Sequence, residues 1–384
     1  MKIMSDQKVS IILHSHGGCD KVCQEILKSL DAEVKYEYPL INSFSVEIST
    51  SKLMDLASVQ YVKYIAADVT VNAQMNIASR EVRANALKNA GHKGKGICIA
   101  IIDTGIFPHA DFLRPIARIK AFKDFVGKKE LPYDDNGHGS FVAGVAAGNG
   151  YISRGKYQGI APEADIIALK ALNKEGNGNT SDILAAIQWV ADHQEEYKIR
   201  VLSLSLGTAV KKLIGNDALV KGVEALWDRG ITVVVAAGNA GPKSSTITTP
   251  GISPKVITVG AVDDKRTPDI SDDTIAEFSS RGPVGWRIKP DVVAPGVKVV
   301  SVKTNKEYQS GHRDTFSAIP YTTMSGTSVA TPIVSGSAAL LLEKYPSWTP
   351  NQVKEALMDN AIPIEKNANA EGKGIIDLEK VIYD

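Results

Sequence analysis

The chain has 384 residues, and its 44 Lys plus Arg against 43 Asp plus Glu give a formal net charge of +1. This balance disfavours proteins that coat nucleic acid or anionic membranes, so we expect neither as a partner. Hydrophobic residues make up 43% and charged residues 23%, which is typical of a folded globular protein. No apolar run approaches the roughly 18 residues of a membrane-spanning helix. At about 150 residues per domain, the length indicates about two domains.

The first residues lack the pattern of a secretory signal. Their longest apolar stretch, residues 9–13, is shorter than the roughly 7–15 residues of a signal's apolar region. Three cysteines, Cys19, Cys23 and Cys98, are too few for a disulfide framework. If Met1 is the true start, these features predict a cytoplasmic protein.

Two of these cysteines lie within ten residues of two histidines in the sequence. His14, His16, Cys19 and Cys23 superficially resemble metal ligands, but their spacing matches no zinc pattern. Cys19 and Cys23 would lie one turn apart on a helix, and we favour buried thiols over a metal or redox site.

The first part of the chain alternates short strand and helix patterns. Strands are predicted over residues 8–14, 33–38, 44–48 and 62–71, and helices over 20–30 and 50–56. This β-α-β-β-α-β order is that of a small ferredoxin-like α+β unit, which we assign to residues 1–73. A unit of this size is marginally stable alone and often needs a partner.

A different pattern follows the polar connector over residues 72–79. Continuous apolar runs, each followed by a helical segment, cover residues 97–102, 166–169, 201–206, 231–237 and 256–259. Such runs indicate strands buried on both faces, and hence a doubly wound α/β domain with a mostly parallel sheet over residues 74–384. In these sheets, function gathers at the carboxyl ends of the strands.

Four polar residues stand at such ends or at helix starts: Asp103, His138, Asn239 and Ser328. Each has an ordinary structural interpretation, as a turn aspartate, a surface histidine, a turn asparagine or a helix N-cap. Together they supply the carboxylate, imidazole, amide and hydroxyl that serine hydrolysis requires.

The order of these residues selects among architectures. An α/β-hydrolase places its histidine after the serine and carries a G-x-S-x-G turn. This sequence has no such turn, and its last histidine, His312, precedes Ser328. The order Asp, His, Ser is that of subtilisin.

The local sequences are specific as well. Asp103-Thr104-Gly105, His138-Gly139-Ser140 and the block from Gly326 to Pro332 resemble the three signature blocks of the subtilisin-like serine proteases, the subtilases. Residues 236–239 resemble that family's oxyanion block and residues 203–207 its substrate-binding strand. The resemblance spans residues 77–360, and block 278–283 together with the missing signal resembles the intracellular bacterial members.

The resemblance implies a subtilisin-like fold and an endopeptidase acting on proteins or peptides. Ser328 would be the nucleophile, His138 the general base, Asp103 the orienting carboxylate and Asn239 an oxyanion donor. Residues 1–73 resemble the inhibitor-type propeptide of such zymogens, which aids folding and occupies the active-site cleft. Peptide would bind as an added strand. The implied substrate-binding residues are Gly176, Gly178, Ser205, Leu206, Gly207, Ala237, Gly238 and Thr248.

Several positions depart from the family pattern. Phe141 stands where a histidine is usual, Ser325 where an asparagine is common, and Thr248 where a glycine often floors the specificity pocket. Thr248 therefore predicts a shallower pocket that favours small side chains. Segment 148–159 lacks the family's asparagine-rich calcium loop, so calcium is optional and no catalytic step requires a cofactor. Asp263-Asp264 and Asp272-Asp273 are candidate calcium ligands, though solvated loop aspartates are the commoner case.

Two other functions compete with this interpretation. A catalytically silent subtilase scaffold that binds protein partners would typically lack one of the four polar residues, and all four are present. An esterase or lipase is disfavoured by the missing G-x-S-x-G turn.

Overall fold

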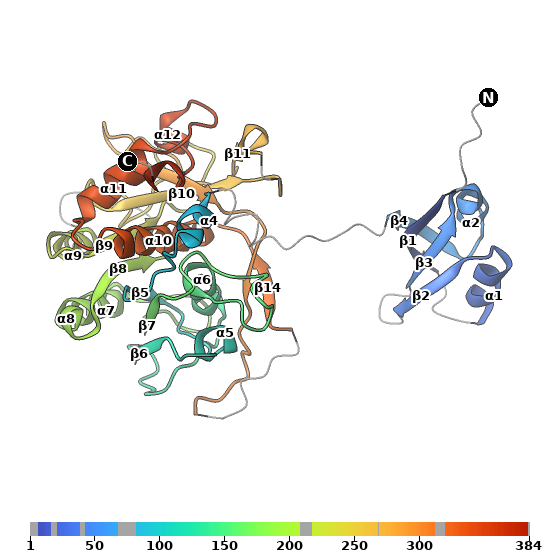
Figure 1. Cartoon of the computed structure of the whole chain (residues 1–384), viewed down its shortest axis with the longest axis horizontal. Coiled ribbons are helices and arrows are strands. Elements are labelled where there is room, and N and C mark those ends of the chain that lie inside the picture. Colours follow the sequence, from blue (N-terminus) through green and yellow to red (C-terminus); the bar gives the residue numbers. More distant parts are fainter. Residues whose placement is uncertain are drawn as a thin grey trace. The chain divides into compact units, whose positions relative to one another are not determined.

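Two compact units, Met1–Asn72 and Ala73–Asp384, make up the chain in the computed structural model (Figure 1). The structure describes residues 7–16, 21–38, 43–67, 82–207, 217–267, 269–311 and 319–382. None of the helices in these ranges is long and apolar enough to cross a membrane.

The first unit has the predicted order of elements. They are β1 (Lys8–Ser15), α1 (Lys21–Ser29), β2 (Glu33–Tyr38), β3 (Ser43–Ser49), the 3-10 turn η2 (Thr50–Lys52), α2 (Leu53–Ala57) and β4 (Val62–Ala67). The strands form an antiparallel sheet in the order β2-β3-β1-β4. The predicted last strand reaches Ala67, and its residues 68–71 lie outside the described ranges, as does the connector over 72–79.

A small apolar core holds this unit together. Leu13, Leu27, Phe44 and Leu56 are each at most 2% exposed, and the Cys23 side chain is buried among them. Cys19 lies outside the described residues, and nothing is described of the His14 side chain. Because the Cys23 side chain is only 4% exposed, the prediction that this thiol is buried is confirmed.

The second unit is built on a mostly parallel sheet. Its strands run in the order β11-β10-β9-β8-β5-β7-β6, with β12 beside β10. The strands are β5 (Cys98–Asp103), β6 (Ile119–Asp124), β7 (Asp165–Lys170), β8 (Ile199–Leu204), β9 (Thr232–Ala236), β10 (Ile257–Asp263), β11 (Thr274–Ile275) and β12 (Val292–Pro295). Only the β10–β11 pair is antiparallel among these pairings of the described residues.

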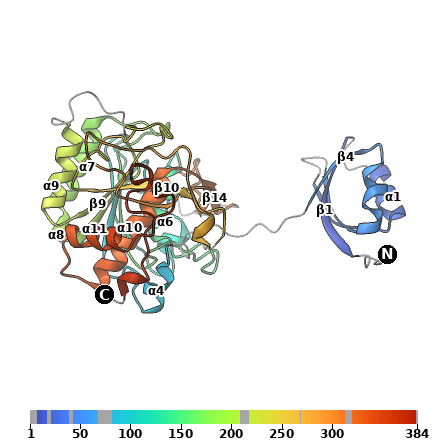
Figure 2. The ribbon, with the colours of Figure 1, turned by 90° about the horizontal axis from the view of Figure 1, so that it is seen from above.

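Helices cover both faces of this sheet (Figure 2). Helices α6 (His138–Ala147) and α10 (Thr327–Lys344) pack together on one face, and α7 (Thr180–Asp192) and α9 (Ala218–Asp228) on the other. The remaining elements are α4 (Ala84–Asn89), α5 (Ala110–Leu113), α8 (Gln194–Tyr197), η4 (Ile270–Asp272), β13 (Val299–Val302), β14 (Tyr321–Met324), α11 (Pro350–Asp359), α12 (Ala368–Glu371) and η5 (Lys380–Ile382). The predicted doubly wound α/β architecture is confirmed.

The structure adds strands that were not predicted, namely β6, β11, β12, β13 and β14, and it corrects one predicted connection. Strand β6 was not predicted, because it lies at the edge of the sheet and most of its residues are only partly buried, so it forms no continuous apolar run. The expectation of a helix after every apolar run is wrong between β9 and β10, where the described chain crosses as a loop. That loop carries Asn239 and Thr248, so it forms part of the site instead.

Candidate active site

The four polar residues singled out in the sequence lie at one edge of the parallel sheet. Asp103 is the last residue of β5, and Asn239 follows the end of β9. His138 is the first residue of α6 and Ser328 the second residue of α10. Because the carboxyl ends of parallel strands meet at the same edge, residues far apart in the sequence converge there.

Asp103 and His138 form a close pair. Nδ1 of His138 lies 2.8 Å from Oδ1 and 2.9 Å from Oδ2 of Asp103. The Thr104 amide donates a further hydrogen bond of 2.7 Å to Asp103 Oδ1. The carboxylate side chain is 1% exposed and the imidazole 27% exposed, so one face of the histidine is open to solvent.

The carboxylate controls the charge of the histidine. Burial opposes the imidazolium, but the charge of Asp103, its hydrogen bond and the nearby Asp134 outweigh that cost, and the pKa of His138 is raised above its ordinary value. An imidazole tied at Nδ1 to a carboxylate keeps its other nitrogen available to accept a proton.

A second buried carboxylate fixes the loop before His138. Asp134, 2% exposed, accepts hydrogen bonds from the Gly137 and Ser140 amides, each at 2.8 Å. The hydroxyls of Ser140 and Thr104 donate to it at 2.6 and 2.9 Å. These bonds satisfy amides at the start of α6, where a negative charge is also favoured by the helix dipole.

Gly139 allows α6 to reach the end of β5. A Cβ at this position would collide with the backbone oxygen of Gly105 and lie 3.2 Å from the Asp103 Cβ. The Gly139 amide also donates to the Thr104 hydroxyl at 2.8 Å. A side chain here would push His138 away from Asp103.

The amide of Asn239 is oriented by Thr327. Asn239 Oδ1 accepts hydrogen bonds from the Thr327 amide at 2.9 Å and from its hydroxyl at 3.0 Å. The Gly238 amide donates to the same hydroxyl at 3.2 Å. With Oδ1 occupied in this way, the Nδ2 donor remains available on the opposite side of the amide.

Three polar atoms surround the space that a side chain at Gly326 would fill. A Cβ built there would lie 2.9 Å from Ser328 Oγ, 3.5 Å from Asn239 Nδ2 and 3.7 Å from the Ser328 amide nitrogen. Glycine therefore leaves room for a ligand atom beside a hydroxyl and two N–H donors.

These residues open onto one cleft of about 590 Å³. Of the predicted site residues, His138, Gly176, Gly178, Ser205, Leu206, Gly207, Asn239 and Ser328 line it, together with Thr104, Asn136, Leu172, Asn177, Thr180 and Ile183. Asp103 lies behind His138.

Three predicted substrate-binding residues do not line this cleft, namely Ala237, Gly238 and Thr248. Ala237 is fully buried, and its carbonyl accepts hydrogen bonds from the Thr248 amide and hydroxyl at 2.9 and 3.2 Å. A Cβ at Gly207 would meet Thr248 Oγ1, and a Cβ at Gly238 would lie 2.7 Å from Thr248 Cγ2. Thr248 therefore fills the space between residues 205–207 and 237–239.

Comparison with known proteins identifies the family. The family model of the Subtilase family matches residues 94–377. Serine protease AprX of Bacillus subtilis (strain 168) is 39% identical over 397 residues, which cover 99% of this chain and 89% of that protein. Subtilisin E of the same organism is 32% identical over 365 residues, covering 93% and 84%. The solved structure of Sphericase aligns with a TM-score of 0.61 at 30% identity, covering 74% of this chain and 92% of that one.

The chain belongs to the subtilase family. It is a serine protease, a hydrolase whose general mechanism is Ser-His-Asp catalysis. As a subtilase it acts on protein or peptide substrates.

Two departures from the subtilase pattern have structural roles. Phe141 is fully buried in α6 and packs in the core of the second unit. Ser325 Oγ accepts a hydrogen bond of 2.8 Å from the Lys298 amide.

Sequence reasoning missed the residues that hold this subtilase site in place. Thr327, Asp134 and Lys170 all act through hydrogen bonds to distant segments. Thr327 lies within the block from Gly326 to Pro332 and Asp134 only four residues before His138, so their proximity to the site was available from the sequence. Among the described residues, no group of three or more His, Cys, Asp or Glu side chains is placed to hold a metal ion.

The raised pKa of His138 predicts the pH dependence of this subtilase. Only the neutral imidazole can accept a proton, so kcat/KM should rise with pH through a midpoint above about 6.5, the ordinary histidine pKa. The measurement is kcat/KM for a peptide anilide from about pH 5 to about pH 10. Asp103→Asn removes the carboxylate charge, and it should lower kcat by about 10⁴-fold and move the midpoint to lower pH. A midpoint that stays in place in Asp103→Asn would contradict this account.

Proposed function

We propose that Ser328 is the nucleophile, His138 the general base and Asp103 the carboxylate that orients it. The observation that carries this assignment is the Asp103–His138 pair, which opens onto the same cleft as Ser328. Ser328 Oγ attacks the scissile carbonyl while His138 takes its proton. His138 then returns the proton to the leaving amine, and water hydrolyses the acyl-enzyme by the same route.

The Asn239 side chain and the Ser328 amide are the proposed oxyanion donors. Their nitrogen atoms lie near the space that a Gly326 side chain would fill, and the Ser328 hydroxyl lies near the same space. Thr327 holds the Asn239 amide before the substrate arrives, so no reorientation is needed as negative charge develops.

Substrate peptide binds as an added strand in this proposal. Segments 205–207 and 176–178 both line the cleft, and their backbone groups would pair with an extended peptide. Thr248, between Gly207 and Gly238, limits the depth of the pocket for the residue before the scissile bond. The protease should therefore prefer small side chains at that residue.

The competing functions have weaker support. A catalytically silent scaffold has no need for an imidazole held at 2.8 Å from a buried carboxylate beside a hydroxyl-bearing cleft. An esterase or lipase has no need for two backbone segments such as 176–178 and 205–207 along the cleft, where an extended peptide could pair.

Replacing the nucleophile tests the central assignment. Ser328→Ala should abolish labelling by a fluorophosphonate probe and hydrolysis of casein, because the attacking hydroxyl is removed. Ser325→Ala is the matched control, since Ser325 is a serine three residues earlier that accepts from the Lys298 amide, and it should keep both activities. Casein hydrolysis by Ser328→Ala would refute the assignment.

Thr248→Gly tests the specificity proposal. Removing this side chain should raise the ratio of kcat/KM for phenylalanine over alanine before the scissile bond by about 10-fold or more. Thr246→Gly serves as the control, because the Thr246 hydroxyl bonds the Lys243 carbonyl within the same loop. An unchanged ratio in Thr248→Gly would show that Thr248 does not limit the pocket.

The N-terminal unit is proposed to be an inhibitory propeptide and folding aid, which makes the full chain a zymogen. Support comes from its own core and β-α-β-β-α-β order directly ahead of the protease unit. The alignment to AprX takes in almost the whole chain, this unit included. A cytoplasmic location is proposed because three cysteines are too few for a disulfide framework, which suits a reducing compartment. Calcium remains an optional structural ion outside the chemistry.

Adding the N-terminal unit back in trans tests the propeptide proposal. A chain beginning at residue 73 should hydrolyse peptide faster than the intact chain, and separate residues 1–72 should inhibit it in a dose-dependent way. Residues 1–72 carrying Leu27→Asp are the control, because a charge at this 1% exposed core position should unfold the unit and weaken inhibition. Absence of inhibition by the wild-type unit would overturn the proposal.

A further inference from the structure

Lys170 is a buried lysine that takes no part in the catalytic steps described above. It is the last residue of β7 and lies opposite Asp103 of β5 in the parallel register. Its side chain is 1% exposed, which is unusual for an ammonium group. A charge in that position is tolerated only when acceptors surround it.

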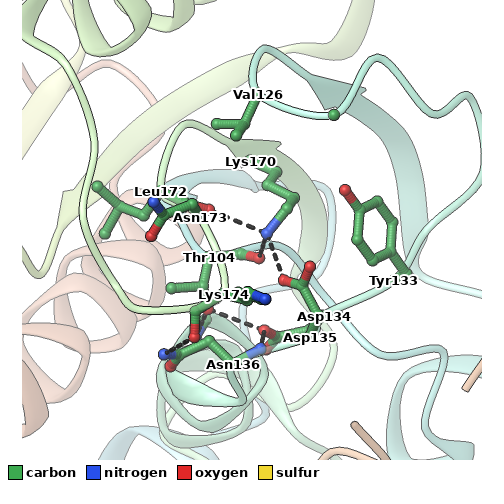
Figure 3. A network of polar contacts seen from close by, with 12 residues as sticks. Thr104, Val126, Tyr133, Asp134, Asp135, Asn136, Lys170, Leu172, Asn173 and Lys174 are labelled. Carbon is green, nitrogen blue, oxygen red and sulfur yellow. Dashed lines mark hydrogen bonds and ion pairs between the residues drawn. The ribbon is translucent and has the colours of Figure 1, made fainter. Parts of the chain in front are cut away.

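All three ammonium hydrogens of Lys170 have acceptors (Figure 3). Nζ donates to the Thr104 carbonyl at 2.7 Å, to Asp135 Oδ1 at 2.7 Å and to the Leu172 carbonyl at 2.9 Å. The Tyr133 ring lies 5.0 Å from Nζ and adds a cation–π contact.

The three acceptors belong to three different segments of the site. Thr104 follows Asp103 and donates its amide to that carboxylate. Asp135 lies in the loop that leads into His138. Leu172 lines the cleft together with Gly176, Asn177 and Gly178, and we call segment 172–178 the peptide-binding edge.

A second tie joins the same loop to the same edge. Asn136 Nδ2 donates to the Lys174 carbonyl at 2.9 Å (Figure 3). Asn136 Oδ1 accepts a hydrogen bond of 3.1 Å from the His138 amide. The loop before His138 is thus connected to segment 172–174 by both a charged and a neutral hydrogen bond.

We propose that Lys170 is a positioning residue, which holds the Asp103–His138 pair in register with the peptide-binding edge at residues 172–178. Without its ammonium group, the loop before His138 loses its charged tie to that edge, and the carbonyls of Thr104 and Leu172 lose their donor. The base and a bound peptide would then no longer be held at a fixed distance. This inference rests on the proposed roles of His138 and of the cleft edge.

The test is Lys170→Met, which keeps the hydrocarbon stem and removes the donors. With active sites counted by fluorophosphonate titration, kcat/KM for an extended peptide anilide should fall by about 10²-fold, with kcat lower and KM higher. A small ester such as p-nitrophenyl acetate cannot pair with the edge, so it should lose less. Misplacement of the base predicts this split, which a loss of folded protein would not produce.

Lys289→Met is the matched control. Lys289 is likewise buried, at 2% exposure, and its Nζ bonds Asp291 Oδ2 at 2.6 Å and Thr258 Oγ1 at 2.8 Å. Its partners belong to β10 and the β12 region rather than to the cleft. Lys289→Met should lower the melting temperature as Lys170→Met does, yet leave kcat and KM per titrated site unchanged.

Asp135→Ala keeps the proposal testable if Lys170→Met fails to fold. The Asp135 side chain is 35% exposed, and its loss should reduce kcat/KM for the extended peptide by about 10-fold while sparing the small ester. The proposal would be overturned if Lys170→Met kept wild-type kcat and KM per titrated site. If Lys170→Met is unfolded, wild-type values in Asp135→Ala would overturn it instead. Failure of the probe to label the wild-type chain at Ser328 would instead overturn the proposed function.

Discussion

Two buried carboxylates at the carboxyl end of β5 set the geometry of this site. Asp103 and Asp134 are 1% and 2% exposed, and negative charges in such positions require several hydrogen-bond donors each. The donors come from the residue after β5, from the loop before His138 and from the first turn of α6. Satisfying these charges therefore fixes the loop, the start of the helix and the direction of the His138 ring together.

The strand ends and their polar residues could be predicted from the sequence, because burial on both faces demands continuous apolar runs. Asp103 and Asn239 stand out as polar residues directly after such runs. Strand β6 could not be predicted in this way, since an edge strand is only partly buried and its residues carry a mixed pattern. The loop between β9 and β10 was open to prediction, because Gly241-Pro242 and Pro250-Gly251 are turn signals that a helix interior would not carry.

The supporting contacts were beyond sequence reasoning for a different reason. Lys170 ends an apolar run as a polar residue, which by itself predicts exposure at a strand end. Two of its three acceptors are a carbonyl 66 positions away and a carboxylate 35 positions away, so only the register of β5 and β7 reveals its burial. Likewise, Thr327 reaches Asn239 across 88 positions. The four polar residues of the site stand at strand ends or helix starts that the sequence reveals, whereas the residues that hold them depend on which strands become neighbours.

Thr104 shows how closely reaction and support are joined within one short block. Its amide donates to Asp103, its carbonyl accepts from Lys170, and its hydroxyl accepts from the Gly139 amide while donating to Asp134. All the polar groups of one fully buried residue are thus used, each toward a different segment. A residue in this position must carry a hydroxyl to satisfy both Gly139 and Asp134. The middle residue of the Asp103-Thr104-Gly105 block is therefore constrained by the start of α6 as much as by the Asp103 carboxylate.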